Sequence, residues 1–125
     1  MKRLSILTPL CVFAAALCSA HVAGAQTSGD EALLLMQQAA RKGDQKTLAQ
    51  LLPATQGHPL QVWAEYWELK ARLANASSAE VESFLQRWQG SYLEDRLRND
   101  WLLQLGQRRQ WGEFSRLHGD FRMQD

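Results

Sequence analysis

The stretch from residue 96 to residue 114 constrains the fold most strongly, because it carries two apolar stripes at helical spacing on either side of a glycine. The first stripe contains Leu97, Trp101, Leu102 and Leu105, which share one face of a helix. Gly106 follows where a helix takes its left-handed C′ residue, a conformation that glycine adopts without strain. The second stripe contains Trp111, Phe114 and Leu117. We therefore predict a helical hairpin that needs further helices packed against it.

The rest of the chain repeats this helical spacing and has no extended run of period 2, which predicts an all-α fold. We predict six helices, at about residues 30–42, 44–52, 59–74, 77–89, 91–105 and 110–118. Two apolar stripes on the third helix predict that it is an inner helix with two neighbours. We predict that the helices pair as first with second, third with fourth and fifth with sixth, which gives a short α-solenoid of about three stacked helical hairpins, part of a larger superhelix.

Capping residues mark several of these helix ends. Asp44 is the predicted N-cap of the second helix, and Gly43 is the stop signal before it. Capping boxes are predicted at Ser77–Glu80 and Ser91–Glu94, where a serine hydroxyl and a glutamate carboxylate satisfy each other's free backbone N–H groups. Pro59 suits the first turn of the third helix.

The first 25 residues have the pattern of a secretory signal peptide. Lys2 and Arg3 form a basic start, residues 4–17 form an apolar run, and Ala23-Gly24-Ala25 is a cleavage site. The apolar run is too short for a transmembrane anchor, which needs about 20 residues. We therefore expect an exported chain that is cleaved near Ala25 and starts at Gln26.

The remaining chain divides into three parts by composition. Residues 26–29 are a polar leader, and residues 30–118 form the predicted superhelical α-hairpin domain. Residues 119–125 are predicted to be a truncated tail, because Phe121 and Met123 have no following segment to pack on.

Cysteine content and charge exclude several classes of protein. Both cysteines, Cys11 and Cys18, lie in the signal peptide, so we expect no disulfide and no thiolate metal site after cleavage. Without Lys2 and Arg3, 12 of the 14 basic residues remain against 13 acidic residues. The two signs are interspersed, which disfavours nucleic acid and anionic lipid as partners and predicts no stable membrane insertion after cleavage.

Two histidines remain after cleavage, and neither His58 nor His118 has a second ligand at helical spacing. We therefore predict no metal site and no cofactor. For His58 we expect a structural role, in which the ring bonds a nearby backbone group or carboxylate.

Glu65 is the candidate for a glycosidase-like acid, because Trp63, Tyr66 and Trp67 surround it in the sequence and an apolar pocket raises the pKa of a carboxyl. The alternative is a solvated helix face on which Glu68 pairs with Arg72 at i, i+4. We favour the solvated face.

Four arginines near two tryptophans are a candidate site for an anionic or sugar ligand. They are Arg96, Arg98, Arg108 and Arg109, with Trp101 and Trp111. In the alternative, which we favour, the tryptophans belong to the core and the arginines pair with Glu94, Asp95, Asp100 and Glu113.

Taken together, these motifs resemble the N-terminal superhelical, U-shaped domain of soluble lytic murein transglycosylases over residues 30–117. The residues that carry the resemblance are His58, Pro59, Leu60, Tyr66, Trp67, Phe84, Leu85, Arg98, Trp101, Leu102, Gly106, Arg108, Trp111 and Phe114. The resemblance implies a periplasmic protein of a diderm bacterium and a ring-like helical domain. In this family a later goose-lysozyme-like domain holds one catalytic glutamate in a Glu-Ser context. That domain cleaves peptidoglycan and leaves a 1,6-anhydro end.

Nothing in this chain resembles the goose-type catalytic domain, so no catalytic residue is carried over from the family. The expectation is an exported, non-catalytic helical scaffold whose partners are peptidoglycan or the remaining domains of a transglycosylase. The alternative is a stand-alone periplasmic helical-repeat adaptor, suggested by Phe121 and Met123. A third possibility, an intact small glycan-active enzyme, depends on Glu65.

Overall fold

A computed structural model describes residues 27–123, and these residues form six α-helices and two short 3₁₀ helices without a strand. The helices are α1 (Gly29–Lys42), α2 (Gln45–Leu51), η1 (Leu52–Thr55), α3 (Gln61–Ala71), η2 (Leu73–Asn75), α4 (Ser78–Arg87), α5 (Tyr92–Gln107) and α6 (Trp111–His118). The all-α prediction is confirmed. The predicted signal peptide lies outside the described residues, and within residues 27–123 no helix has the length and apolar character needed to span a membrane.

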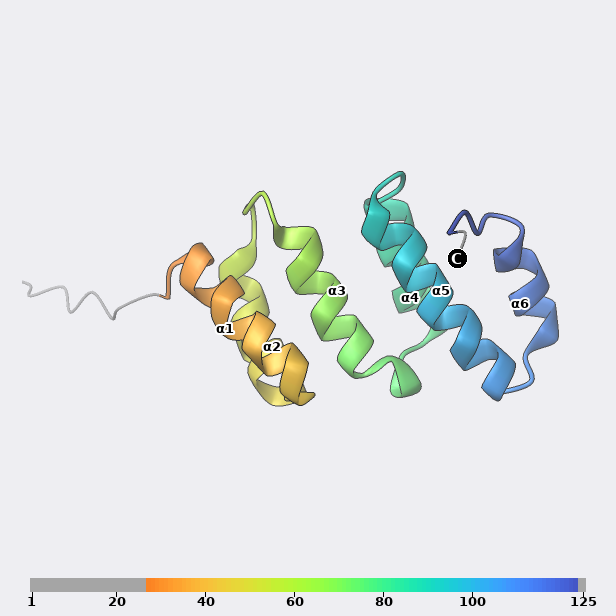
Figure 1. The fold of residues 1–125 in the computed structure, drawn as a ribbon, viewed down its shortest axis with the longest axis horizontal. Coiled ribbons are helices and arrows are strands. Elements are labelled where there is room, and N and C mark those ends of the chain that lie inside the picture. Colours follow the sequence, from red (N-terminus) through yellow and green to blue (C-terminus); the bar gives the residue numbers. More distant parts are fainter. Residues whose placement is uncertain (1–26, 124–125) are drawn as a thin grey trace, which may run out of the picture.

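The helices lie in a row along the long axis of the molecule, with α1 and α2 at one end and α6 at the other (Figure 1). As predicted, α1 packs on α2 and α5 packs on α6, while α3 is an inner helix that contacts α1, α2 and α5. The predicted hairpin of the third and fourth helices is wrong, because the backbone of α4 lies against that of α5 and not against that of α3. Side chains still join α4 to α3, as in the ion pair of Arg87 with Glu65.

Two groups of buried side chains form the core. The larger joins α3, α4, α5 and α6 and includes Leu97, Trp101 and Leu105 of α5, whose side chains are fully buried. The smaller joins α1, α2 and α3 around Met36 and Leu48. Trp67 packs against both groups and so connects them. The predicted apolar stripe of Leu97, Trp101, Leu102 and Leu105 is buried in the larger group, as the sequence indicates.

Most helix starts are capped as the sequence predicts. The Asp44 carboxylate accepts a hydrogen bond from the backbone N–H of Thr47, and Ser77 and Glu80 form the complete capping box. At α5 only half of the predicted box forms. Ser91 accepts from the N–H of Glu94, but the carboxylate of Glu94 accepts from the N–H of Gly90 instead of that of Ser91.

The predicted end of α5 is wrong. Gly106 lies inside the helix, and Arg109 is the left-handed residue, with a φ of 57°. The N–H of Gln110 bonds the carbonyl of Leu105 and the N–H of Arg109 bonds that of Gly106, which is a Schellman motif with Arg109 at C′. The helix continues past Gly106 because the N–H of Arg108 still bonds the carbonyl of Gln104.

One further prediction is wrong in detail. Pro59 lies in an exposed turn two residues before α3 and not in its first turn. In the tail, Phe121 packs back against the larger group of the core, and the backbone N–H of Arg122 donates to both carboxylate oxygens of Asp95.

Candidate functional site

The residues that carry the family resemblance do not converge on one site. Those buried in or packed against the larger core group are Tyr66, Trp67, Phe84, Leu85, Trp101, Leu102 and Phe114. Those that line a surface groove between α1, α3 and α5 are His58 and Leu60, together with Tyr66 and Trp67. Pro59 lies in the exposed turn between His58 and Leu60. Those that lie on α5, after it or on α6 are Arg98, Gly106, Arg108 and Trp111. Most of the motif is therefore structural in this fold.

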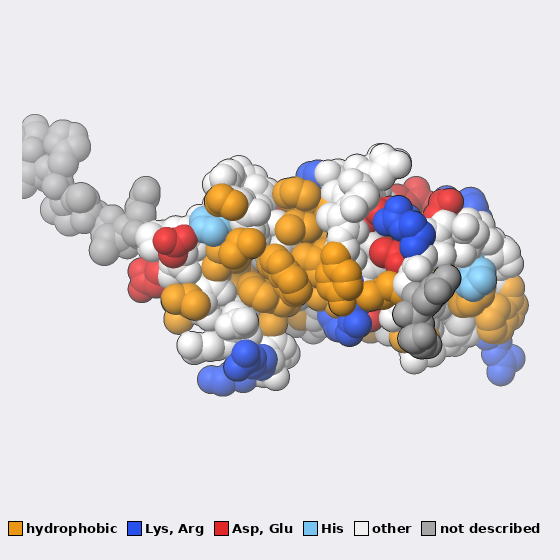
Figure 2. All heavy atoms as spheres, turned by 45° about the horizontal axis from the view of Figure 1, so that its top comes forward, with side chains coloured by type: hydrophobic (Ala, Val, Ile, Leu, Met, Phe, Trp, Pro, Cys, Tyr) orange, Lys and Arg blue, Asp and Glu red, His pale blue; other side chains and the backbone are white. Residues whose placement is uncertain are grey.

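Two adjoining clefts form this groove, which we call the aromatic groove, and they share Gln37, Trp63 and Trp67. The cleft between α1 and α3 has a volume of about 440 Å³ and adds Asp30, Leu33, Leu34, His58 and Leu60. The cleft that reaches from α3 to α5 has a volume of about 610 Å³ and adds Ala40, Arg41, Gly43, Tyr66, Lys70, Ala71, Tyr92, Leu93 and Arg96. Figure 2 shows hydrophobic side chains gathered over the α1 and α3 half of the molecule and reaching toward α5.

The groove is open to solvent although large apolar side chains make up much of its lining. Leu34 is 64% exposed, Leu60 is 50% exposed and Tyr92 is 60% exposed. Trp63 stands between them with its ring against the rings of Tyr66 and Trp67. Contiguous exposed apolar surface of this kind marks interaction sites in folded proteins.

Sequence reasoning missed this groove, although one signal was present. The apolar face of the first helix includes Leu34 and Leu35 as well as Leu33 and Met36, so it is wider than one packing partner covers. Only the tertiary structure shows that Leu34, on the outer part of this apolar face, lies across a cleft from Leu60.

His58 closes one end of the groove, and its predicted structural role is confirmed. Its Nδ1 accepts a hydrogen bond from the N–H of Leu60 at 3.0 Å, which makes Nε2 the protonated nitrogen that donates to Asp30 at 2.7 Å. Gly29 permits this arrangement, since a Cβ there would lie 3.1 Å from the imidazole ring.

Positive charge gathers at the other end of the groove, between α3 and α5. The Tyr66 hydroxyl donates to Asp100 at 2.7 Å, and Lys70 donates to that hydroxyl at 3.1 Å while lying 3.3 Å from Asp100. Burial and the hydrogen bond to Asp100 raise the pKa of Tyr66. Within residues 27–123, Arg41 and Arg96 line the same cleft without an ion pair to a carboxylate.

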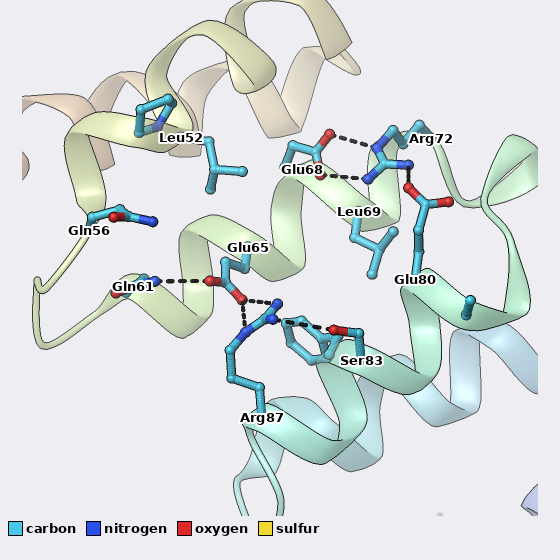
Figure 3. Close-up of a pocket in the computed structure, with 13 residues that line it drawn as sticks. Leu52, Gln56, Gln61, Glu65, Glu68, Leu69, Arg72, Glu80, Ser83 and Arg87 are labelled. Carbon is cyan, nitrogen blue, oxygen red and sulfur yellow. Dashed lines mark hydrogen bonds and ion pairs between the residues drawn. The ribbon is translucent and has the colours of Figure 1, made fainter.

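A separate cleft, of about 530 Å³, lies between η1, α3 and α4 and is lined by Glu65, the glutamate that the sequence singles out. Figure 3 shows Glu65 between Gln61 and Arg87, and Arg72 between Glu68 and Glu80. The predicted Glu68–Arg72 pair is confirmed, with Arg72 Nε 2.6 Å from Glu68. This cleft is therefore a network of paired charges.

Glu65 lacks the environment of a general acid. Burial opposes its ionisation, but hydrogen bonds from the Trp88 indole, Gln61 and Arg87 outweigh burial and lower the pKa of Glu65 below 4.5. A catalytic acid needs the opposite shift. These hydrogen bonds favour a structural role for Glu65 over that of a general acid. The predicted solvated face is wrong, because the side chains of Glu65 and Glu68 are only 15% and 13% exposed and lie among ion pairs between helices.

One Glu-Ser dipeptide occurs in the chain, at Glu82-Ser83, and it matters because the resembled family carries its catalytic glutamate in that context. Glu82 lies on α4, where its side chain is 38% exposed and paired with Arg116. Glu82 lines a small surface cleft of about 230 Å³ together with Arg116, and at 38% exposure its setting is that of a surface ion pair.

Arg98 is the centre of a buried charge cluster at the end of the molecule near α6. Its guanidinium donates to Glu94 at 2.6 Å, to Asp95 at 3.1 Å and to the carbonyl of Asp120 at 3.4 Å. Arg122 adds a second guanidinium to Glu94 at 2.7 Å. The predicted pairing of Arg98 with Glu94 and Asp95 is confirmed, and the cluster holds the tail to α5.

The predicted ion pairs of arginines with Asp100 and with Glu113 do not form. Arg108 instead lies 4.8 Å from the Trp101 ring and donates to the carbonyl of Ala74 at 2.6 Å, so it ties the end of α5 to the end of η2. Glu113 accepts from the indole of Trp101 and from Ser78. Trp111 is 57% exposed, so its predicted place in the core is wrong.

Within residues 27–123 no group of three or more His, Cys, Asp or Glu side chains is arranged to hold a metal ion. In comparisons with known proteins, no family model, no curated protein and no solved structure matches the chain, so the resemblance read from the sequence stays a prediction.

Proposed function

We propose that the chain is an exported, non-catalytic helical scaffold that serves cell-wall murein turnover in the periplasm. In this proposal its helices are the opening part of a superhelix like the N-terminal U-shaped domain of soluble lytic murein transglycosylases. The observation that carries the proposal is the order of packing. The principal contacts of each helix are with helices one or two places away along the chain, which is how a solenoid grows.

The state of the carboxylates supports a scaffold rather than an enzyme. Glu65, Glu68, Glu82 and Glu94 each accept hydrogen bonds from arginine side chains that link one helix or turn to another. A carboxylate held in this way stabilises the fold and is a poor proton donor near neutral pH.

The proposed partners are peptidoglycan or the remaining domains of a transglycosylase. The test is to express the full chain in a diderm bacterium, fractionate the cells and cross-link the periplasm. The proposal predicts a processed chain that begins at Gln26 and cross-links to sacculi or to a lytic transglycosylase. A chain that keeps residues 1–25 and remains in the cytoplasm contradicts it.

A second candidate function is a periplasmic helical adaptor that binds another protein. Phe121 no longer supports it, because that side chain packs against the core. The aromatic groove supports it instead, since Leu34, Leu60, Trp63 and Tyr92 leave an apolar surface open across three helices.

A further inference from the structure

The two halves of the aromatic groove differ in chemistry. The half between α1 and α3 is walled by Leu33, Leu34 and Leu60. The half that reaches α5 is walled by aromatic rings and by Arg41, Lys70 and Arg96. Because Trp63 and Trp67 line both halves, one ligand can occupy them together. Such a ligand has an apolar end and a negatively charged end that faces the cations.

Asp100 offsets only part of the positive charge of those cations. It lies 3.3 Å from Lys70 and is its partner, while Arg41 and Arg96 have no carboxylate within ion-pair distance among residues 27–123. Asp30 lies at the opposite end and is engaged by His58. No carboxylate lines the half that reaches α5. The groove therefore presents an excess of positive charge at one end only.

We propose that the aromatic groove binds an acidic, amphipathic peptide segment of a partner protein. A leucine-like or aromatic side chain of the peptide packs between Leu34, Leu60 and Trp63, and a carboxylate farther along meets Arg96 and Arg41. This inference rests on the adaptor proposal and adds the chemistry of the partner. Packing in the apolar half supplies affinity, and the cations set the direction in which the peptide lies.

Other occupants fit the groove less well. A sugar brings hydroxyl groups that the leucines of the apolar half cannot hydrogen-bond, so their burial there is costly. A flat anionic membrane needs cations over a whole face, whereas here Asp30 lies at the rim of the apolar half. A second copy of the chain offers no carboxylate from the cationic half of its own groove.

The test is a selection from a random peptide display library on the purified full chain, followed by fluorescence-polarisation titration of synthetic copies of the enriched peptides. The expected peptides combine Asp or Glu with Leu, Phe or Trp. Arg96→Glu and Trp63→Ala are expected to weaken binding by about tenfold or more, and added salt is expected to weaken it further.

Two variants outside the groove serve as matched controls. Trp111→Ala removes an exposed tryptophan of α6, and Arg109→Glu reverses an exposed arginine that forms no ion pair among residues 27–123. Each is expected to change affinity by less than about twofold. Far-ultraviolet circular dichroism checks the fold of every variant. If Trp63→Ala unfolds the chain, Leu34→Glu replaces it, because that side chain is 64% exposed.

The remaining outcomes separate the two proposals. Enrichment of basic or uncharged peptides that are sensitive to Trp63→Ala overturns the acidic partner and leaves the adaptor intact. Failure to enrich any peptide, or binding that all four variants leave unchanged, overturns both. Binding of N-acetylglucosamine oligomers or anionic phospholipid vesicles that Trp63→Ala abolishes assigns the groove to that ligand and contradicts the peptide. If sedimentation shows a dimer that Trp63→Ala abolishes, the groove binds a second copy of the chain, and the peptide proposal is contradicted.

Discussion

At the scale of single residues, neighbours decide whether a glutamate is an acid or a link between helices. Trp63, Tyr66 and Trp67 adjoin Glu65 in sequence, and that composition suggests an apolar pocket. In the fold the Glu65 carboxylate instead faces Arg87 and the indole N–H of Trp88, both from α4. Sequence cannot reveal these donors, because they are more than 20 residues away and reach Glu65 only through tertiary packing.

The lowered pKa of Glu65 predicts a specific dependence of stability on pH. Since the pKa is below its unfolded value of 4.5, the ionised carboxylate adds stability that is fully present above pH 4.5 and is lost as pH falls through the folded pKa. Glu65→Gln should therefore cost stability at pH 7 and cost progressively less as the pH falls below 4.5.

Carboxyl NMR of the wild-type chain gives the pKa of Glu65 directly. A value below 4.5 is expected. A value near or above about 6, as a general acid has, contradicts the structural role.

Arg98 shows the opposite case, in which sequence spacing predicts the partners correctly. Glu94 and Asp95 precede it by four and three residues on the same helix, so helical geometry alone brings them together. What the spacing does not reveal is burial. Arg98, Glu94 and Asp95 are all nearly inaccessible to solvent, because the tail around Asp120 covers them.

Arg98→Met should lower the free energy of unfolding by about 3–5 kcal/mol, because it removes the buried guanidinium from Asp95 and Glu94 and leaves only the more exposed Arg122 beside Glu94. Arg116→Met is the matched control. It breaks the exposed pair with Glu82, whose side chains are 58% and 38% exposed, and should cost no more than about 1 kcal/mol. Urea titrations measure both, and equal costs for the two variants contradict the buried cluster.

At the scale of secondary-structure elements, helix starts are easier to predict than helix ends. Asp44 and Ser77 cap as predicted because a short polar side chain can satisfy N–H groups within its own first turn. The end of α1 is also read correctly, with Gly43 in the left-handed conformation at a φ of 67°. The end of α5 is not, because tertiary contacts of Arg108 with Trp101 and Ala74 extend the helix past Gly106.

Gly106→Ala tests this end directly. Because Gly106 is helical and a Cβ there would meet only Trp111 at 4.0 Å, alanine should stabilise the chain by about 0.5–1 kcal/mol. Gly43→Ala is the control, since the left-handed conformation there should cost about 1–2 kcal/mol. Thermal unfolding of both variants gives the signs. If Gly106→Ala destabilises the chain, Gly106 is the left-handed C′ residue that the sequence pattern suggests, and the helical assignment is contradicted.

At the scale of the whole molecule, the sequence predicts the class of fold but not the arrangement of all helices. Six helices follow from apolar spacing and caps, and the central place of α5 follows from Leu97, Trp101 and Leu105. The pairing of α4 with α5 does not follow, because η2 and the extended Ala76 separate α3 from α4 by a turn whose direction sequence does not specify. The aromatic groove depends on that arrangement and is missed for the same reason.

We propose that the charged and aromatic side chains of this chain hold helices together and position partners without breaking a glycosidic bond. The most direct measurement is mass spectrometry of soluble muropeptides after purified sacculi are incubated with the purified chain, beside an active lytic transglycosylase. We predict no 1,6-anhydro muropeptides above the level without protein. Their release by the wild-type chain, and its loss in Glu65→Gln or Glu82→Gln, contradicts the account.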